Sequence, residues 1–331
     1  MENGLEMNME HNEAVIDIKP TKKTFSKIGF GLMAVMLLAQ GIPLLIISLL
    51  REFAPNILKD YNTILTYALS FLPLYLVAIP VFLFIMKDMP SFKVAKEHRK
   101  KLKVSEFLTY MFVGFGAMYI SNFISVLLNL LIGALKGETI INPLESMIGN
   151  KMWMNALFIG ILAPVLEEIV FRGLLINKLR VYGEGLCIFA SGFTFALLHG
   201  NLSQMLYAFA LGMLFAYIAL KTGTILYTII LHMIVNMLGS VVFPSLILSK
   251  NVVSIMLVLV LLFTFIALGI TLFFINKKKI KIQNSSEGLS TGKKIKAFVW
   301  NPGMIAYMVV VFLCVLTVIF NTEVTEFFSK L

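Results

Sequence analysis

Three ionisable residues stand inside a strongly apolar part of the chain, in the stretch LEEIVFRG from Leu166 to Gly173. A charged side chain at the centre of a bilayer costs about 2.5–3.5 kcal/mol on the insertion scale, so three of them require compensation. Glu168 and Arg172 are spaced i,i+4, which places them on one face of a helix and allows them to pair. Glu167 lies about 100° further round that helix and lacks this partner. We therefore identify Glu167 as the candidate reactive carboxylate, with Glu168 and Arg172 as its supports.

Two later apolar stretches carry polar side chains suited to a reaction at Glu167. FALLHG places His199 four residues after Phe195, and LHMIVN places Asn236 four residues after His232. A carboxylate can take a proton from water while one imidazole orients that water, and a second imidazole and an amide can donate to a developing oxyanion. No serine or cysteine has an obvious activating base, which disfavours covalent catalysis. The pattern predicts hydrolysis by an activated water.

The composition indicates an integral membrane protein. Of the 331 residues, 59% are hydrophobic and 14% are charged, whereas soluble domains average about 45–50% apolar and about 25% charged residues. The net charge is +10, but the basic residues lie in short loops between apolar segments, which is typical of orientation in a membrane rather than of nucleic-acid binding. We expect the lipid bilayer and a membrane-associated peptide or protein as partners, and neither nucleic acid nor a cofactor or metal.

The apolar segments predict an all-α, polytopic membrane helix bundle. Nine segments are long enough, or nearly so, to cross a hydrocarbon core of about 30 Å. Their extents are 28–50, 63–86, 107–132, 152–176, 186–202, 203–220, 224–243, 252–275 and 302–320. Within the fourth segment, Pro164 lacks an N–H and should bend the helix. We expect an eight-helix catalytic core and a ninth, C-terminal transmembrane helix.

The loops predict the orientation and the division of the chain. Basic residues concentrate in alternate loops, chiefly 87–103 and 277–296, which places the N-terminus in the cytoplasm. The few tryptophans and the many isoleucines and lysines favour a bacterial plasma membrane. The predicted parts are a polar and basic cytoplasmic tail (1–27), a transmembrane core (28–275) with the polar motifs at about 150–240, a basic cytoplasmic linker (276–301), and the extra helix with a short tail (302–331).

Three motifs together resemble those of a known family. EEIVFR fits EExxxR, FALLH fits FxxxH, and HMIVN fits HxxxN, in this order and within predicted membrane helices. Over roughly residues 150–240 the chain is similar to the CAAX-protease and bacteriocin-processing family (the Abi or type II CAAX prenyl endopeptidase family), which are intramembrane glutamic endopeptidases. The resemblance implies an eight-helix core that opens to the cytoplasm and requires no metal. It also implies a role in peptide maturation or bacteriocin self-immunity.

The resemblance assigns roles to the candidate residues. It implies that Glu167 and His199 activate the water, and that His232 and Asn236 stabilise the oxyanion. Glu168 and Arg172 take supporting roles.

Two other classes of function stay open at this point. Glu167, His199 and His232 form an acceptable zinc ligand set, which would make the protein a zinc-dependent membrane hydrolase, although HExxH spacing is absent. Intramembrane acids also mark proton paths, so the protein could be a non-catalytic carrier or an immunity protein that acts by binding.

Overall fold

The computed structural model describes residues 18–60, 62–92, 94–140, 142, 151–283 and 289–320. Residues 1–17 of the predicted tail, 284–288 of the predicted linker and 321–331 at the C-terminus lie outside the described residues. Within the described ranges, all regular structure is helical and no strand is present. The prediction of an all-α bundle is confirmed.

The chain forms a series of long helices, several of which contain π-helical turns. The first elements are α1 (Ile18–Phe53), the short α2 (Pro55–Asp60), α3 (Asn62–Leu72) with its continuation η1 (Pro73–Ala78) and α4 (Ile79–Ile85), and α5 (Val104–Lys136). The central elements are α6 (Met152–Met154), η4 (Asn155–Leu162), α7 (Ala163–Glu168), η5 (Ile169–Leu175), α8 (Ile176–Leu179), α9 (Glu184–Leu198), α10 (Leu202–Thr222), α11 (Leu226–Met237), η7 (Leu238–Val242) and α12 (Phe243–Leu248). The last elements are α13 (Val252–Asn276), α14 (Thr291–Val299) and α15 (Pro302–Ile319).

Seven helices of the described part are long and apolar enough to cross a membrane by length and composition. They coincide with seven of the nine segments expected from the sequence. The other two are the helix from α6 to α8, which carries the charged stretch, and α9, a shorter apolar helix. The protein is therefore a multi-pass membrane protein. An α-helix forms hydrogen bonds between its own backbone N–H and C=O groups. A chain that crosses the bilayer core requires these bonds because no water is available there.

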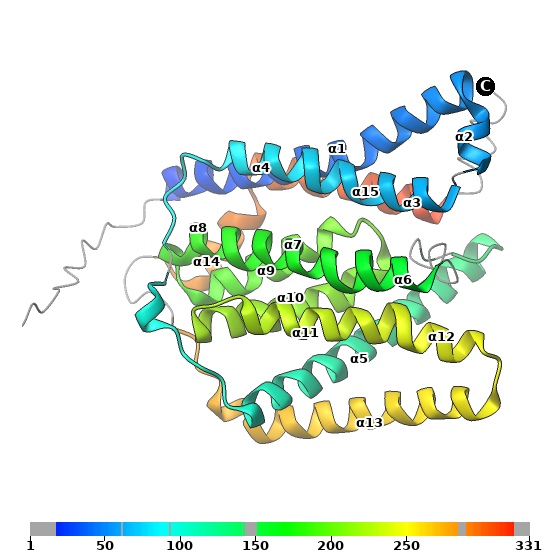
Figure 1. The fold of residues 1–331 in the computed structure, drawn as a ribbon. Coiled ribbons are helices and arrows are strands. Elements are labelled where there is room, and N and C mark those ends of the chain that lie inside the picture. Colours follow the sequence, from blue (N-terminus) through cyan, green and yellow to red (C-terminus); the bar gives the residue numbers. More distant parts are fainter. Residues whose placement is uncertain are drawn as a thin grey trace, which may run out of the picture.

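The helices pack in three layers (Figure 1). One layer holds α1, α3, α4 and α15, with α1 lying along α15. The middle layer runs from α6 to α12, and within it α9 packs along α10 while α11 packs against η4 and α7. The third layer holds α5 and α13, which pack along each other, and α5 also contacts α10. The helix that carries Glu167 is thus enclosed between two layers.

The fourth predicted span is one continuous helix in which π-helical and α-helical stretches alternate. The π-helical stretch η4 ends at Leu162, and α7 begins directly with Ala163 and Pro164. A second π-helical stretch, η5, follows Glu168. π-Helical turns widen a helix, and they occur frequently at functional sites. The sequence predicts a bend at Pro164. The structure shows a change from π-helix to α-helix at this point and a change back to π-helix directly after Glu168.

Glycines set the closest helix approaches. A Cβ atom built on Gly212 of α10 would lie 2.7 Å from the Cα of Gly192 of α9, so the two backbones touch. The pairs Gly29–Gly303 between α1 and α15, and Gly116–Gly269 between α5 and α13, repeat this arrangement. Small residues are the usual means by which membrane helices approach closely, because lipid supplies no hydrophobic force between them. These contacts fix the positions of the helices around the fourth span.

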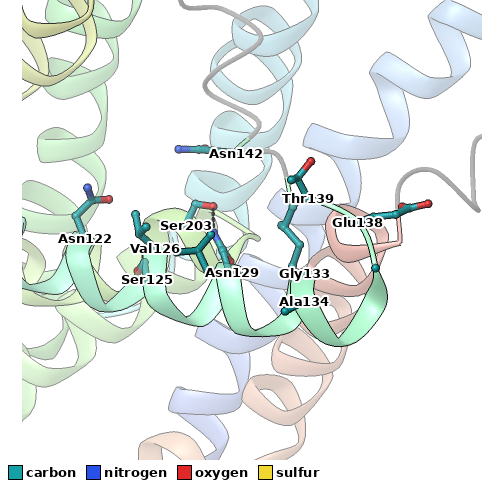
Figure 2. Close-up of a pocket in the computed structure, with 13 residues that line it drawn as sticks. Asn122, Ser125, Val126, Asn129, Gly133, Ala134, Glu138, Thr139, Asn142 and Ser203 are labelled. Carbon is teal, nitrogen blue, oxygen red and sulfur yellow. Dashed lines mark hydrogen bonds between the residues drawn. The ribbon is translucent and has the colours of Figure 1, made fainter. Parts of the chain in front are cut away.

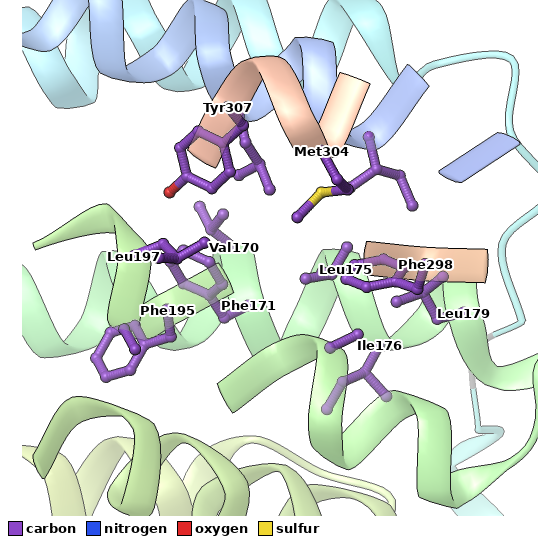
Figure 3. Close-up of a cluster of buried hydrophobic side chains, with 14 of the residues drawn as sticks. Val170, Phe171, Leu175, Ile176, Leu179, Phe195, Leu197, Phe298, Met304 and Tyr307 are labelled. Atoms are coloured by element: carbon purple, nitrogen blue, oxygen red, sulfur yellow. The ribbon is translucent and has the colours of Figure 1, made fainter. Parts of the chain in front are cut away.

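The C-terminal elements close one side of the bundle. The predicted linker contains α14, whose Phe298 is fully buried. Figure 3 shows Phe298 and the α15 residues Met304 and Tyr307 facing the side chains of η5, α8 and α9. The ninth helix is therefore packed into the bundle through α1 and α9. The sequence predicts the ninth helix, but it indicates neither α14 nor this packing.

The glycine contact at α9 and α10 gives a first prediction. We expect Gly212→Ala to destabilise the protein by about 1–3 kcal/mol, because an added methyl meets backbone that cannot move aside. The matched control is Gly41→Ala in α1, where an added Cβ meets nothing within 4 Å. Thermal unfolding in detergent compares the two. Equal melting temperatures of Gly212→Ala and Gly41→Ala would contradict the prediction that the backbone contact at Gly212 leaves no room for a methyl group.

Candidate active site

The centre of the site is a buried ion pair. Arg172 Nη1 donates to Glu168 Oε1 at 2.8 Å, and both side chains are 0% exposed. Arg172 Nη2 also donates to the carbonyl oxygen of Gly212 at 3.3 Å. The guanidinium lies 4.4 Å from the ring centroid of Phe195 and 5.5 Å from that of Phe215, over their faces. The charge of Arg172 is thus balanced by a carboxylate, a carbonyl and two aromatic faces, which is the form in which a buried charge is tolerated. The pairing predicted from the i,i+4 spacing is present.

His232 of α11 joins the two glutamates. Its Nδ1 lies 2.9 Å from Glu168 Oε1, and its Nε2 lies 3.7 Å from Glu167 Oε2. A carboxylate that is paired with arginine only accepts hydrogen bonds, so Nδ1 carries the proton in this contact. Nε2 is then the nitrogen that faces Glu167. His232 thus lies between the two glutamates, and its contact with Glu168 fixes the orientation of the imidazole.

Glu167 faces away from the Glu168–Arg172 ion pair, towards the layer of α1 and α4. Its side chain is 16% exposed, and the Tyr75 hydroxyl of η1 donates to its Oε1 at 3.5 Å. A cavity of ≈ 10 Å³ lies between Glu167, Tyr75 and apolar side chains of α1. This volume is at the lower limit of the room that one water molecule requires.

His199 lies at the end of α9 and is connected to the others through Phe195. Its Nδ1 is 2.9 Å from the carbonyl oxygen of Phe195, which accepts only, so the proton is on Nδ1 and Nε2 is left as an acceptor. The ring of Phe195 contacts both imidazoles edge-on, with centroids 5.0 Å from His199 and 5.7 Å from His232. Among the described contacts, His199 makes no hydrogen bond to Glu167.

Asn236 is tied to the fourth span. Its Nδ2 donates to the carbonyl oxygen of Ile159 in η4 at 2.9 Å. One amide N–H therefore bridges two helices, and the second N–H of the same group is left for another acceptor. The four predicted catalytic residues thus come from helices that pack together, but only Glu167 and His232 are in direct contact.

Two contributors are not predicted by the sequence. Tyr75 is one of two tyrosines in an apolar segment, and only its position two residues after Pro73 in the π-helical η1 distinguishes it from Tyr67. The carbonyl of Gly212 contributes through its backbone, so its residue type gives no sign of the role.

The zinc alternative predicts three ligands at a common point. In the part of the chain that the structure describes, no group of three or more His, Cys, Asp and Glu side chains is placed to hold a metal ion.

A larger pocket lies elsewhere, beside α5. It has a volume of ≈ 720 Å³ and is lined by a polar row on α5 (Asn122, Ser125 and Asn129), by Ser203 of α10 and by Glu138 and Thr139 (Figure 2). Asn129 Nδ2 donates to Ser203 Oγ at 2.8 Å. None of the six predicted site residues lines this pocket.

The fold and the site define a multi-pass membrane protein with a buried carboxylate–imidazole centre. Residues 149–238 match the family model described as type II CAAX prenyl endopeptidase Rce1-like. The matched segment contains the charged stretch, both histidines and Asn236, and the predicted resemblance to the CAAX-protease family is confirmed over it. The part of the chain that forms the site is thus similar to this family. Neither the search of curated proteins nor that of solved structures gave a match.

The buried ion pair gives a second prediction. We expect Arg172→Met to lower stability by about 3–5 kcal/mol, because Glu168 is left buried without its countercharge. The matched control is Lys221→Met, which breaks the Lys221–Glu106 pair, whose side chains are 35% and 38% exposed. That change should cost about 0–1 kcal/mol. Unfolding of the two purified variants in detergent measures the difference, and an equal loss in both would contradict a special role for the buried pair.

Proposed function

We propose that this protein is an intramembrane endopeptidase that hydrolyses a peptide bond of a membrane-associated or lipidated peptide or protein. The observation that carries the proposal is the contact of Glu167 with His232, which rests on the buried Glu168–Arg172 pair inside the matched segment. A non-catalytic protein has no need of a proton-exchanging pair beside a cavity of water size.

In the proposed reaction, Glu167 takes one proton from a water molecule while the water oxygen attacks the carbonyl carbon of the peptide. His199, whose Nε2 is an acceptor, orients that water. The proton that Glu167 takes passes to Nε2 of His232, and the imidazolium N–H so formed and the second amide N–H of Asn236 donate to the oxyanion that develops. The carbon–nitrogen bond then breaks, the proton held by the Glu167–His232 pair passes to the departing amine, and a carboxylic acid and an amine are released.

Glu168 and Arg172 act as positioning residues in this proposal. Glu168 holds Nδ1 of His232, and Arg172 fixes Glu168. This arrangement keeps the imidazole in one tautomer and one orientation, as an orienting carboxylate does in a catalytic triad.

The orientation of the protein is also a proposal. Figure 1 shows that the start of α1, the connection from α4 to α5 and the end of α13 lie at one end of the bundle. These segments contain the basic clusters 87–103 and 277–296. Positive residues favour the cytoplasmic side, so we place this end and the N-terminus in the cytoplasm of a bacterial cell. A role in peptide maturation or bacteriocin self-immunity is consistent with this location.

Replacement of the carboxylate tests the proposal. We expect Glu167→Gln to reduce peptide release at least about 100-fold, because it removes the group that takes the proton of water. The measurement is mass spectrometry of the peptides released from membranes that contain either the wild-type protein or the variant. The matched control is Glu97→Gln, which changes an exposed glutamate of the basic loop. Undiminished peptide release by folded Glu167→Gln would reject the hydrolytic mechanism.

Chelation separates this mechanism from the zinc alternative. A glutamate and histidine mechanism predicts that the purified protein keeps its activity after treatment with a strong chelator and dialysis. Loss of activity on chelation, with recovery when zinc is added back, would instead support a zinc hydrolase that uses Glu167, His199 and His232.

A further inference from the structure

Another pocket lies at the end of the bundle that we place in the cytoplasm. It has a volume of ≈ 670 Å³ and is lined by residues from the start of α1, the end of α4 and the end of α8, which Figure 1 shows at the same end of the molecule. The membrane span of α1 begins at Lys22, and the span that contains α4 ends at Ile85. The pocket is therefore at the level where two spans leave the apolar core and where lipid headgroups lie.

Three lysines from two separate helices line this pocket, which we call the lysine pocket. Lys23 and Lys27 are spaced i,i+4 on α1, so they share one face of that helix, and Lys178 lies in α8. Asp88 is the one acid among the described residues that line the pocket, so the lining carries a net charge of +2. Cations that gather around a hollow attract an anionic ligand.

Lys178 brings one of these charges into the wall of the lysine pocket. Its side chain belongs to a residue that is only 8% exposed, and its Nζ donates to the carbonyl oxygen of Met89. The N–H of Phe92 donates to the carbonyl oxygen of Asn177 at 2.8 Å, so the connection that follows α4 is attached to α8 at two points. A buried ammonium is stabilised by each acceptor that surrounds it, and an anion in the pocket would add one.

The α1 side of the pocket offers donors to an anion. Lys23 is exposed and has no ion-pair partner in the described part of the chain. Lys27 Nζ lies 3.8 Å from Asp88 Oδ2, and because these side chains are 40% and 71% exposed, this pair is weak. Ser26 Oγ accepts the N–H of Gly303 at 2.9 Å and keeps its own hydroxyl proton for a further acceptor. Ammonium and hydroxyl groups are suitable donors to the oxygens of a phosphate.

The rest of the rim of the lysine pocket is apolar. Phe30 and Phe92 are each 45% exposed and Val181 is 48% exposed, and all three line the pocket. Phe30 is three residues further into the membrane span than Lys27, which is about 4.5 Å along the helix axis. A ligand whose anionic group contacts the lysines would therefore place its neighbouring part against exposed apolar side chains. This combination favours an amphiphile over a small soluble anion.

We propose that the lysine pocket binds an anionic phospholipid of the adjacent leaflet. The phosphate of the headgroup contacts the three lysines, and the first part of the acyl chains contacts the apolar rim. A zwitterionic headgroup fits less well, because its choline would bring a cation to a lining of net positive charge. The bound phosphate connects α1 to α8, and so joins the first layer to the helix that carries Glu167. The inference goes beyond the proposed function and does not depend on peptide hydrolysis.

Thermal unfolding of the purified, delipidated full-length protein in a neutral detergent tests the proposal. The protein is titrated with phosphatidylglycerol, with phosphatidylcholine of the same acyl chains, or with inorganic phosphate balanced against sodium chloride at equal ionic strength. A ligand that binds the native state raises the melting temperature, and the midpoint of the rise gives its apparent affinity. We expect the midpoint for phosphatidylglycerol to be about tenfold lower than that for phosphatidylcholine, and inorganic phosphate to give no rise beyond that of sodium chloride.

Substitutions locate the preference in the lysine pocket. The double variant Lys23→Gln with Lys27→Gln should lose the preference for phosphatidylglycerol, and it should fold because neither side chain is buried. Asp88→Asn should strengthen binding of phosphatidylglycerol by about threefold, because it removes the acid of the lining and the weak pair to Lys27. The matched control is Lys101→Gln, which removes an exposed cation of the basic loop outside the pocket and should leave the preference unchanged.

Three results would overturn the proposal. Equal midpoints for the two lipids would show that the pocket does not select an anionic headgroup. A preference that persists in the double variant, or that falls equally in Lys101→Gln, would place the effect on the general surface charge. A rise with inorganic phosphate that equals the rise with phosphatidylglycerol would assign the pocket to a soluble anion.

Discussion

The buried contact between Glu168 and Arg172 is the constraint on which the site depends. Both side chains are fully enclosed in an apolar bundle, where an unpaired charge is strongly unfavourable. The pair therefore requires every surrounding contact to be in place, including the carbonyl of Gly212 and the faces of Phe195 and Phe215. It links the fourth span to α9, α10 and α11. It also orients His232 towards Glu167, so the proposed function divides the structural and the chemical role between two adjacent glutamates.

The helix packing around this pair allows the division of roles. Backbone contact at Gly192 and Gly212 brings α10 close enough for its carbonyl to reach Arg172. The π-helical stretches on either side of α7 contain the carbonyl that holds Asn236 and the guanidinium of Arg172. Because adjacent residues of a helix differ by about 100°, Glu168 faces the middle layer while Glu167 faces Tyr75 and the small cavity beside it. One helix thus provides a partner for the buried ion pair and a carboxylate for the small cavity.

Much of this arrangement follows from the sequence, and the remainder depends on tertiary contacts. Apolar segment length predicts the all-α membrane bundle, and the i,i+4 spacing predicts the pairing of Glu168 with Arg172. The convergence of Glu167 and His232 follows from the motifs. Tyr75, the carbonyl of Gly212 and the bond from Asn236 to Ile159 do not, because each depends on how two distant helices are placed. The packing of α14 and α15 could not be predicted for the same reason. The segment that forms α14 is basic and lies next to a serine-rich stretch, so its sequence resembles a linker.

In the proposed function, the charge of Glu168 stabilises the fold and the carboxylate of Glu167 takes part in the reaction. The most direct measurement is the thermal stability of Glu167→Gln and Glu168→Gln, purified and unfolded side by side in the same detergent. The account predicts that Glu168→Gln loses several kcal/mol, about 3–5, because Arg172 is left buried without its partner, while Glu167→Gln melts close to the wild-type protein. Equal stability of the two variants, or a larger loss in Glu167→Gln, would contradict it.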